Sequence, residues 1–338
     1  MPAAKRLIKI GLVLVLAAAF VLSGTVWLPL YSLGPGPARE VEPLIQVTGH
    51  PEYASSGRFV MTSVRFRQLT GLGALLAWLD PDQAVVPRKD LFSPGETQAE
   101  EHQRAISQMD QSKLDATSVV LSDLTGYPKE HRPGALVEGV VAGCAADGEL
   151  YPGDLIRAID GQTIRGAAQA GRLIESAPSG STLTFDIRAG GEKHRVDLVR
   201  APCSGRDEPL VGVSLISNFP FGVRIESGDV GGPSAGLMWA LGLYDLLTPG
   251  DLTAGRTIAG TGQIGLDGTV YPIGGIEEKV VAAEHAGASV LLVPEANLTA
   301  ARSAGGDGMD LVPVASFQDA VDYLERGTLI APARAEPR

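Results

Sequence analysis

The sequence is poor in aromatic residues, cysteine and histidine, and it has no basic run beyond its extreme N-terminus. Aromatic residues make up 5% of the 338 residues, and there are two cysteines and five histidines. The formal net charge of −11 argues against nucleic acid as the main partner, because phosphate binding requires a basic face. The histidines are scattered and form no His-Glu-x-x-His pattern, so we expect no metal and no cofactor.

The sequence also lacks the Gly-x-x-x-x-Gly-Lys-Ser/Thr loop that cradles the phosphates of ATP. The two cysteines, Cys144 and Cys203, would be able to pair in an oxidising compartment, but their spacing leaves the disulfide open. Hydrophobic residues, in contrast, are abundant. Hydrophobic residues make up 44% of the chain and charged residues 20%, which is enough to build cores for two or three domains.

The N-terminus has the pattern of a membrane anchor. Residues 1–9 include three basic residues, and residues 10–38 carry no charge. A helix of about 20 apolar residues spans a bilayer, and Trp27 suits its outer interface. We therefore expect a cytoplasmic N-terminus, a single transmembrane helix at 10–31, and residues 40–338 outside the cytosol at the cell membrane. A cleaved signal peptide is the alternative, although no small-x-small cleavage site follows the run.

A β-rich unit is predicted for residues 126–202, after an α+β region at 40–125 that shows no chemical pattern. The unit contains Leu150-Tyr-Pro-Gly-Asp-Leu-Ile-Arg-Ala-Ile-Asp-Gly161 and then strands of alternating polarity. This pattern resembles a PDZ domain, a fold that binds an extended peptide as an added strand. The resemblance places one segment near the peptide groove: Val137-Glu138-Gly139-Val140-Val141. A small β-rich spacer is the alternative reading.

The third unit, residues 209–327, alternates apparent strands and helices. Residues 257–272 read as a hairpin that turns at Asp267-Gly268, and residues 289–294 read as a buried strand. The unit also contains a serine at the start of a very apolar helix. The segment is Asp229-Val-Gly-Gly-Pro-Ser-Ala-Gly236. Free N–H groups and the helix dipole at such a position stabilise negative charge, as an acyl-transfer oxyanion requires. The neighbours of Ser234 are the candidates for this backbone site: Gly232, Pro233, Ala235 and Gly236.

A lysine lies on the apolar face of a second predicted helix. Lys279 follows Ile276 by three residues and precedes Ala283 by four, whereas Glu278 lies off that face. A lysine takes a proton from a serine hydroxyl only if burial lowers its pKa from about 10.4 toward about 7–8. We therefore predict Ser234 as nucleophile and Lys279 as general base.

The serine and lysine segments together resemble the proteolytic domain of Lon proteases. The likeness rests on Gly-Pro-Ser-Ala-Gly around Ser234 and on Thr261-Gly-x-Ile-x-x-x-Gly-x-Val-x-Pro-Ile-Gly-Gly-x-x-Glu-Lys279. It implies peptide-bond hydrolysis through an acyl-enzyme, with Thr261 orienting the lysine, and a homo-oligomeric ring. Many Lon enzymes carry an acidic residue three positions before the serine. Here that position is Gly231, and the acidic residue is Asp229.

The whole chain resembles the YlbL-like PDZ-containing proteases of bacteria. The expected fold class is an α/β (α+β) Lon-type proteolytic domain, preceded by a β-rich PDZ domain and an N-terminal transmembrane helix. The expected function is a membrane-anchored, ATP-independent serine endopeptidase that cleaves peptides or unfolded proteins, with substrates selected by the PDZ domain.

Two other functions remain open, and a third is excluded. A catalytically silent PDZ/Lon-like scaffold at the membrane is the main alternative. An α/β-hydrolase elbow fits Gly-x-Ser-x-Gly, but His285 is the one histidine after Ser234 and lies six residues from Lys279 in the same predicted helix. Phosphate binding by the glycine-rich turn before Ser234 is the excluded function, because its spacing fits neither the P-loop nor Gly-x-Gly-x-x-Gly.

Overall fold

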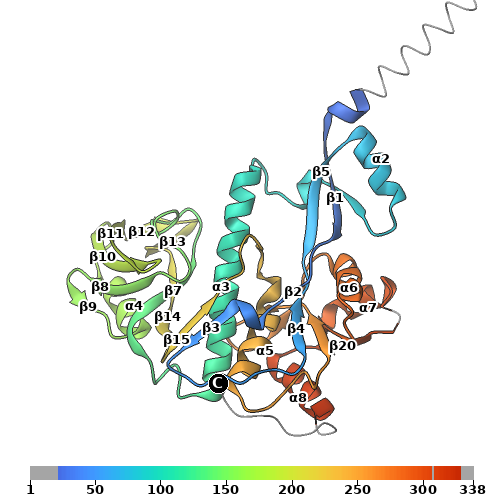
Figure 1. The fold of residues 1–338 in the computed structure, drawn as a ribbon. Helices are drawn as coiled ribbons and strands as arrows, with labels where there is room; N and C mark the ends of the chain where they lie inside the picture. The colour runs from blue at the N-terminus through green and yellow to red at the C-terminus, as the bar shows by residue number, and fades with distance from the viewer. Residues whose placement is uncertain (1–21, 307, 329–338) are drawn as a thin grey trace, which may run out of the picture.

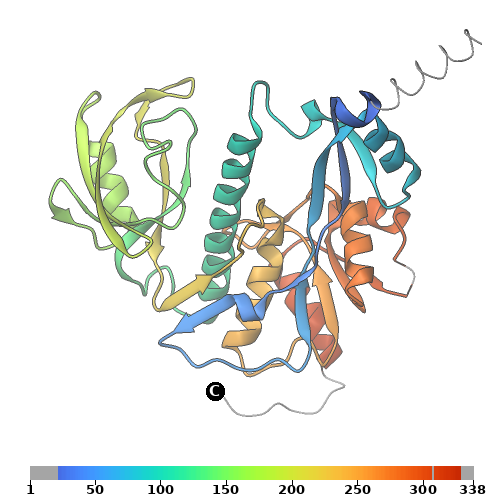
Figure 2. The same ribbon diagram turned by 45° about the horizontal axis from the view of Figure 1, so that its top comes forward.

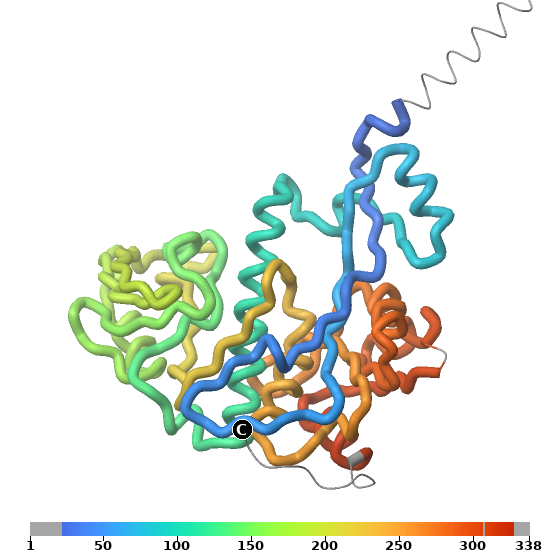
Figure 3. Tube along the Cα trace, viewed as in Figure 1, coloured from blue at the N-terminus to red at the C-terminus, as the bar shows by residue number. Residues whose placement is uncertain are grey.

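The computed structural model describes residues 22–306 and 308–328. Figure 1 shows a larger α/β body, a smaller β-rich body, a long helix between them, and a narrow extension near the N-terminal end. Figures 2 and 3 show the same separation after rotation and as a Cα trace. Within the described ranges, no helix combines the length and apolar character needed to cross a membrane. Residues 10–21 of the predicted anchor lie outside the described residues.

A five-stranded sheet forms the centre of the larger body. The strands, in spatial order, are β2 (Arg39–Glu40), β4 (Arg58–Met61), β16 (Thr257–Gly260), β19 (Val290–Pro294) and β20 (Asp310–Val314). β2 is antiparallel and the other four are parallel. Val290 and Leu292 of β19 enter one core, whereas Leu291 enters the core on the opposite face. Burial on both faces explains the continuous apolar sequence of this strand.

Helices cover both faces of this sheet. They are α5 (Gly236–Leu247) and α8 (Phe317–Thr328) on one face, and α6 (Ile276–His285) and α7 (Leu298–Ser303) on the other. The long helix α3 (Gln98–Leu124) packs along α5. Trp239 of α5 is fully buried, and its indole N–H lies 3.4 Å from the sulfur of Met109 on α3. Core packing of α5 therefore fixes its N-terminal end, where Ser234 lies.

The hairpin predicted for residues 257–272 is wrong in its first half. β16 pairs with β4 and β19, and only β17 (Gln263–Ile264) and β18 (Val270–Tyr271) form a hairpin. The turn is at Asp267-Gly268 as predicted, with Gly268 at φ +81°. Gly262, at φ +157°, redirects the chain directly after β16, which separates the parallel strand from the hairpin.

The predicted region 40–125 is not a unit of its own: its first part, residues 40–61, is built into the larger body, and the rest forms most of the extension and α3. β4 lies inside the central sheet, and β3 (Ile45–Thr48) pairs with β15 (Gly222–Ile225). The 3₁₀ helix η1 (Glu42–Leu44) leads into β3 and contacts α5. All these partners lie far away along the chain, so the sequence pattern could not show them.

The extension is a three-stranded antiparallel sheet, and it corrects the end of the predicted membrane helix. β1 (Trp27–Pro35) lies between β5 (Val64–Thr70) and β6 (Ala84–Pro87), with α2 (Gly71–Leu79) and η2 (Arg88–Asp90) beside them. Residues 27–31 of the predicted helix belong to β1 instead, because pairing with β5 and β6 satisfies the backbone there as a strand. Tyr31 is buried, and its hydroxyl accepts a hydrogen bond from Gln98 at 3.0 Å.

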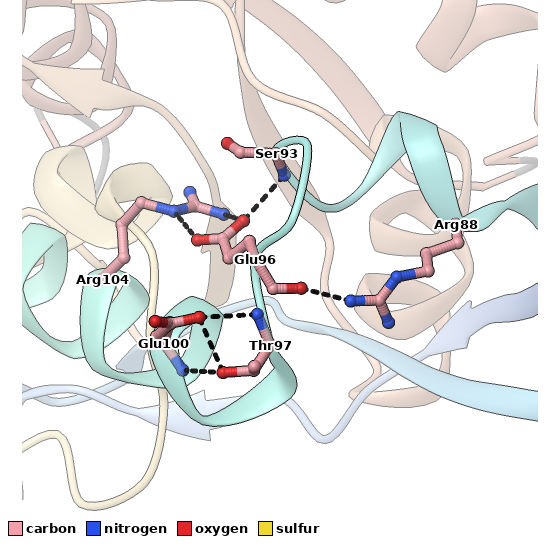
Figure 4. A network of polar contacts seen from close by, with 6 residues as sticks. All are labelled: Arg88, Ser93, Glu96, Thr97, Glu100 and Arg104. Carbon is pink, nitrogen blue, oxygen red and sulfur yellow. Dashed lines mark hydrogen bonds and ion pairs between the residues drawn. The ribbon is translucent and has the colours of Figure 1, made fainter.

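The start of α3 is held beside this extension by a capping box and an ion pair (Figure 4). Thr97 Oγ1 accepts from the Glu100 N–H at 3.2 Å, and Glu100 accepts from the Thr97 N–H at 2.7 Å. Glu96 accepts a hydrogen bond from Arg104 at 2.8 Å, which holds the pKa of Glu96 below its usual value. Arg88 donates to the carbonyl of Glu96. These contacts tie η2 to the first turns of α3.

The smaller body has its own sheet and core. The strands, in spatial order, are β11 (Glu192–Val199), β10 (Thr182–Ala189), β8 (Leu155–Ile159), β7 (Arg132–Val140) and β14 (Val213–Asn218), with β9 (Gln162–Thr163) beside β8. Helix α4 (Ala167–Ser176) packs against this sheet, and β12 (Ala201–Cys203) pairs with β13 (Arg206–Leu210). Cys144 and Cys203 form a disulfide, which answers the question that their spacing left open.

Strand β14 corrects two features of the predicted β-rich unit. β14 pairs with β7, so this body extends beyond the predicted boundary at residue 202 to Asn218. β7 has β8 on its other side, so the predicted groove segment 137–141 belongs largely to an interior strand and Val137 is fully buried. The Val137 backbone exchanges hydrogen bonds with Gly153 and Asp154, and β14 lies on the other side of the strand. The edge strand on this side of the sheet is β14, which lies beyond the unit expected from the sequence.

A buried pair of carboxyl groups joins α3 to this sheet. Asp115 of α3 and Glu138 of β7 are 6% and 8% exposed. Glu138 also accepts hydrogen bonds from Gln111 of α3 and from Ser214 of β14. Burial, together with the charge of Glu138 and a hydrogen bond to it, raises the pKa of Asp115 to about 8. Nothing in the sequence pattern pointed to this contact.

We expect Asp115→Asn to stabilise the protein more at alkaline pH than at acid pH. The folded protein holds a proton on Asp115 that the unfolded chain releases near the ordinary pKa of 3.8, so stability falls as the pH rises from that value to about 8. Urea unfolding of variant and wild type at about pH 5 and about pH 9 measures the difference. Asp110→Asn, at the exposed partner of Lys113, is the matched control. Equal gains at both pH values would contradict the assignment.

Candidate active site

The structure brings together three of the residues singled out in the sequence: Ser234, Thr261 and Lys279. The Nζ atom of Lys279 lies 2.7 Å from Ser234 Oγ and 2.9 Å from Thr261 Oγ1. The Thr261 hydroxyl donates to the carbonyl of Ser234 at 3.0 Å. The amine is therefore held between two hydroxyl oxygens, one of which is itself fixed by the backbone of the serine.

Ser234 lies in the 3₁₀ turn η3 (Pro233–Ala235), which leads directly into α5. The turn is entered through Gly232 at φ +86°, a conformation that favours glycine. Beyond the serine, Gly236 has no room for a side chain, because an added Cβ would lie 2.7 Å from Ser112 Oγ and 2.8 Å from Ile264. The glycines at 232 and 236 are thus required for the path of the chain on both sides of the serine.

The segment after β16 is hydrogen-bonded to the serine turn. The Gly262 N–H donates to the Ser234 carbonyl at 2.8 Å, and the Leu237 N–H donates to the Gly262 carbonyl at 3.0 Å. Thr261 is fully buried at this junction. The backbone therefore sets the distance between the threonine and serine hydroxyls, independently of the lysine.

Lys279 is almost completely enclosed, with 3% of its surface exposed. Burial lowers the pKa of Lys279 to about 7, while the charge of Glu278 works in the opposite direction. Glu278 was predicted to lie off the apolar face of its helix, on the outward side, but it is 6% exposed. A substantial fraction of the amine is neutral at neutral pH, so its lone pair is able to accept the Ser234 proton.

Helix α3 supports the serine turn from behind, which the sequence reasoning did not find. Ser112 Oγ donates to the Pro233 carbonyl at 2.9 Å, and the Gly232 N–H donates to the Ala105 carbonyl at 2.7 Å. An added Cβ at Gly231 would lie 2.7 Å from the Ala105 Cβ. The small residues Ala105 and Ser112 are seven positions apart, two helical turns, and this spacing was the one signal available.

The backbone donors predicted around Ser234 are partly engaged in this structure. The Gly232 N–H donates to α3, the Gly236 N–H donates to the Pro233 carbonyl, and Pro233 has no N–H. Ala235 is buried and lines the cleft next to Ser234. Ser234 and Ala235 therefore line the cleft at the start of α5.

Ser234 and Lys279 open into a cleft of about 650 Å³ between the extension and α3. One wall comes from β1 and β5, including Leu33 and Phe66, and the other from α3, including His102. The cleft is thus bounded by elements of both the extension and α3, and the Ser234–Lys279 pair lies in its lining.

A second groove lies in the smaller body, between α4 and the edge strand β14. It is lined by Gly171 and Ile174 of α4 and by Val213 and Leu215 of β14. An added Cβ at Gly171 would meet no atom within 4 Å. This groove, and not the segment 137–141, has the sheet edge and the facing helix that strand addition requires.

Comparison with known families identifies both bodies. Residues 222–322 match the model of the Lon protease (S16) C-terminal proteolytic domain, and residues 136–188 match the model of the PDZ domain. The chain thus contains a Lon-type proteolytic domain and a PDZ domain, with mixed α/β content overall.

Individual relatives agree with the first match. Lon protease 2 of Bacillus subtilis is 36% identical over 107 residues, which cover 32% of this chain and 18% of the relative. The Lon protease of Desulfosudis oleivorans is 30% identical over 177 residues, 51% of this chain and 19% of the relative. Among solved structures, the PDZ domain of an SdrC-like protein from Listeria monocytogenes is 26% identical, with 24% of this chain and 86% of that chain covered and a TM-score of 0.23.

The chain spans less than a fifth of the length of these two curated Lon proteases. The likeness is concentrated on the domain that holds Ser234, Thr261 and Lys279. The family match and the Lon relatives support a serine-type endopeptidase.

Proposed function

We propose that this chain is an ATP-independent serine endopeptidase that hydrolyses peptide bonds through a Ser234–Lys279 dyad. The observation that carries the proposal is the buried amine of Lys279, with a pKa of about 7, at 2.7 Å from Ser234 Oγ. Burying an amine costs folding free energy, so amines with a strongly lowered pKa cluster at functional sites. A general base at neutral pH needs a pKa of this size. The match to the Lon proteolytic domain supports the same chemistry.

In this mechanism the neutral amine of Lys279 takes the hydroxyl proton of Ser234 while Oγ attacks the carbonyl carbon of the scissile peptide. The tetrahedral intermediate collapses, its C–N bond breaks, and the Lys279 ammonium gives its proton to the leaving amine. Water then attacks the acyl carbon and loses a proton to Lys279. The ester bond to Ser234 Oγ breaks, the new C-terminal carboxyl group leaves, and Lys279 returns its proton to Ser234 Oγ. Each cycle consumes one water and restores both residues.

The negative charge on the carbonyl oxygen develops next to the N-terminal end of α5. Backbone N–H groups and the helix dipole stabilise an anion at that position. We assign this role to the backbone N–H groups of Ser234 and Ala235, because both residues line the cleft and the N–H groups of Gly232 and Gly236 have other acceptors.

Thr261 is a positioning residue in this proposal, and Thr261→Val should lower kcat/KM by about 10- to 100-fold, the effect of losing a hydrogen bond to a charged group. The valine removes both the oxygen that accepts from Lys279 and the hydroxyl that donates to Ser234. Thr261→Ser keeps the hydroxyl and should retain activity within a few-fold. A fall in the apparent pKa or in kcat that is confined to the valine variant separates positioning from general instability, because the lost oxygen accepts from the charged amine. Equal losses in both variants would contradict the role.

The central test uses the full chain in detergent with unfolded casein, with and without ATP and Mg²⁺. We expect cleavage without nucleotide, no gain from ATP, and complete loss in Ser234→Ala. Ser303→Ala, at an exposed serine of α7, is the matched control. Failure of the folded wild type to cleave would favour a catalytically silent scaffold, and cleavage only with ATP would contradict the ATP-independent part.

The PDZ groove is proposed to select protein substrates by taking an extended peptide along β14. The free edge of that strand and the apolar residues facing it from α4 support this role. Gly171→Trp fills the groove without a backbone clash, since the position opens on empty space, and Gly171→Ala is its control. We expect the tryptophan variant to cleave short peptides normally and to lose preference among protein substrates. Unchanged selectivity would remove the groove from the mechanism.

We also propose that the apolar stretch before Trp27 anchors the chain in the cell membrane, with the described domains outside the cytosol. The uncharged sequence 10–26 and the basic residues before it support the anchor and its orientation. The disulfide between Cys144 and Cys203 supports an oxidising compartment.

By likeness to Lon proteases, which are often oligomers, we propose a homo-oligomer, which sedimentation in detergent would test.

A further inference from the structure

The end of the extension carries a concentrated apolar surface. Seven large apolar side chains there are between 51% and 75% exposed, and we call them the apolar tip: Leu22, Val26, Trp27, Leu75, Leu76, Trp78 and Leu79. The other exposed large apolar residues of the described ranges are Phe66 lower on β5 and four residues spread over the rest of the molecule. Contiguous exposed apolar surface of this kind marks an interaction site.

Helix α2 has its polarity reversed relative to a helix of a water-soluble surface. Leu75 and Leu79, one turn apart, lie on the exposed side together with Leu76 and Trp78, whereas the small residue Ala77 is buried. No residue of α2 is charged. A helix on an aqueous surface turns its apolar side inward, so the outward face of α2 is built for an apolar environment.

The apolar tip is continuous with the proposed membrane anchor. Ser23 lies against the first residue of α2, within 3.2–3.4 Å of where a Cβ of Gly71 would be. Trp27 pairs with Thr70, the N-cap of α2, and Gln68 donates to the Leu28 carbonyl at 3.0 Å. A chain that leaves a bilayer near residue 26 must therefore place α2 at the bilayer surface.

We infer that α2 is a monotopic helix whose outward face, Leu75, Leu76, Trp78 and Leu79, lies in the outer interface of the membrane beside the anchor. This inference rests on the proposed anchoring and adds a second, independent contact with lipid. Tryptophan and leucine on the apolar face of an interfacial helix are typical of such a contact. A second copy of the chain is the competing occupant, but the anchor already commits this end of the molecule to the bilayer.

The charges around the apolar tip fit a shallow position. Asp80, directly after α2, accepts hydrogen bonds from the Asp82 N–H and from Gln83, so its carboxylate has partners outside the apolar face. Arg65 and Arg67 on β5 are exposed. At about 3.3 Å per strand residue, Arg67 lies about 10 Å from Thr70, within reach of anionic headgroups.

This placement sets the height of the cleft above the membrane. Leu33 of β1 lines the cleft and lies six residues after Trp27, which corresponds to about 20 Å of strand. Two contacts, the anchor and α2, would fix the orientation of the extension as well as its height. The site would thus meet polypeptide segments close to the membrane surface.

Native tryptophans provide the test in the full chain, reconstituted into vesicles of phosphatidylcholine and phosphatidylglycerol with brominated acyl chains. In Trp27→Phe, the remaining tryptophans are Trp78, 75% exposed, and Trp239, fully buried in the protein core. We expect the Trp78 emission to be blue-shifted and quenched by the brominated lipid. The double variant Trp27→Phe/Trp78→Phe should lose this quenched component entirely and leave the emission of Trp239.

A control places an exposed tryptophan away from the apolar tip. Leu266→Trp in the double-variant background serves this purpose, since Leu266 is 48% exposed and lines the same pocket as Ser122 near the C-terminal end of α3; it should not be quenched. Loss of the chain from vesicles in an alkaline carbonate wash would overturn the anchor and the inference together. A retained chain with water-exposed Trp78 would overturn only the α2 contact. A blue shift without lipid quenching would assign the tip to contact between copies of the chain, which also overturns it.

Discussion

Lys279→Met should lower kcat/KM by about 10³-fold or more while the protein stays folded, since general base catalysis accounts for effects of this size. The methionine fills the space of the lysine stem but has no group to accept the Ser234 proton. The wild-type amine is 3% exposed and its pKa is depressed to about 7, so its enclosure costs stability. The variant should therefore melt at an unchanged or higher temperature.

Lys279→Arg and Ser234→Ala complete this experiment. The guanidinium of arginine does not deprotonate in the working pH range, so Lys279→Arg should be as inactive as the methionine variant despite its positive charge. Ser234→Ala should match both, because the two residues act as one unit and their losses are not additive. Activity above one tenth of wild type in any of these variants, with casein as substrate, would remove the dyad from the mechanism.

Activity should rise about a hundredfold between about pH 5 and about pH 8, with a slope of one, if a single base with a pKa of about 7 must be neutral. The sign follows from the chemistry. Below its pKa the amine is protonated and cannot accept the serine proton, and above it the neutral fraction reaches a plateau. kcat/KM reports the free enzyme, so it should show the midpoint directly.

Two other groups must be separated from Lys279 in the pH profile. Asp115 has its pKa raised to about 8, and His102 lines the cleft. Asp115→Asn and His102→Gln should each leave the midpoint near the same pH. A midpoint that moves or disappears in either variant would transfer the titration away from Lys279, and a flat profile in the wild type would contradict a lysine base.

The local patterns of the sequence predicted much of the proteolytic domain. The apolar helix after Ser234, the helix that carries Lys279 and the buried strand near residue 290 all lie where periodicity placed them. These elements bury a regular face, so their spacing records their structure. The hairpin from residue 257 was predicted wrongly because β16 takes its partners from β4 and β19, and a parallel partner leaves no local signature.

The sequence by itself determined the chemical groups of this protein: a serine at a helix start, a lysine on an apolar face, a threonine between them, and no nucleotide-binding loop. Such groups are readable because motif order and helical spacing are local properties. Only the tertiary structure decided that Lys279 is enclosed, that α3 holds the serine turn, that β14 and not β7 is the PDZ edge, and that α2 turns its leucines outward. Burial and strand pairing depend on which distant segments meet, and no local pattern specifies that.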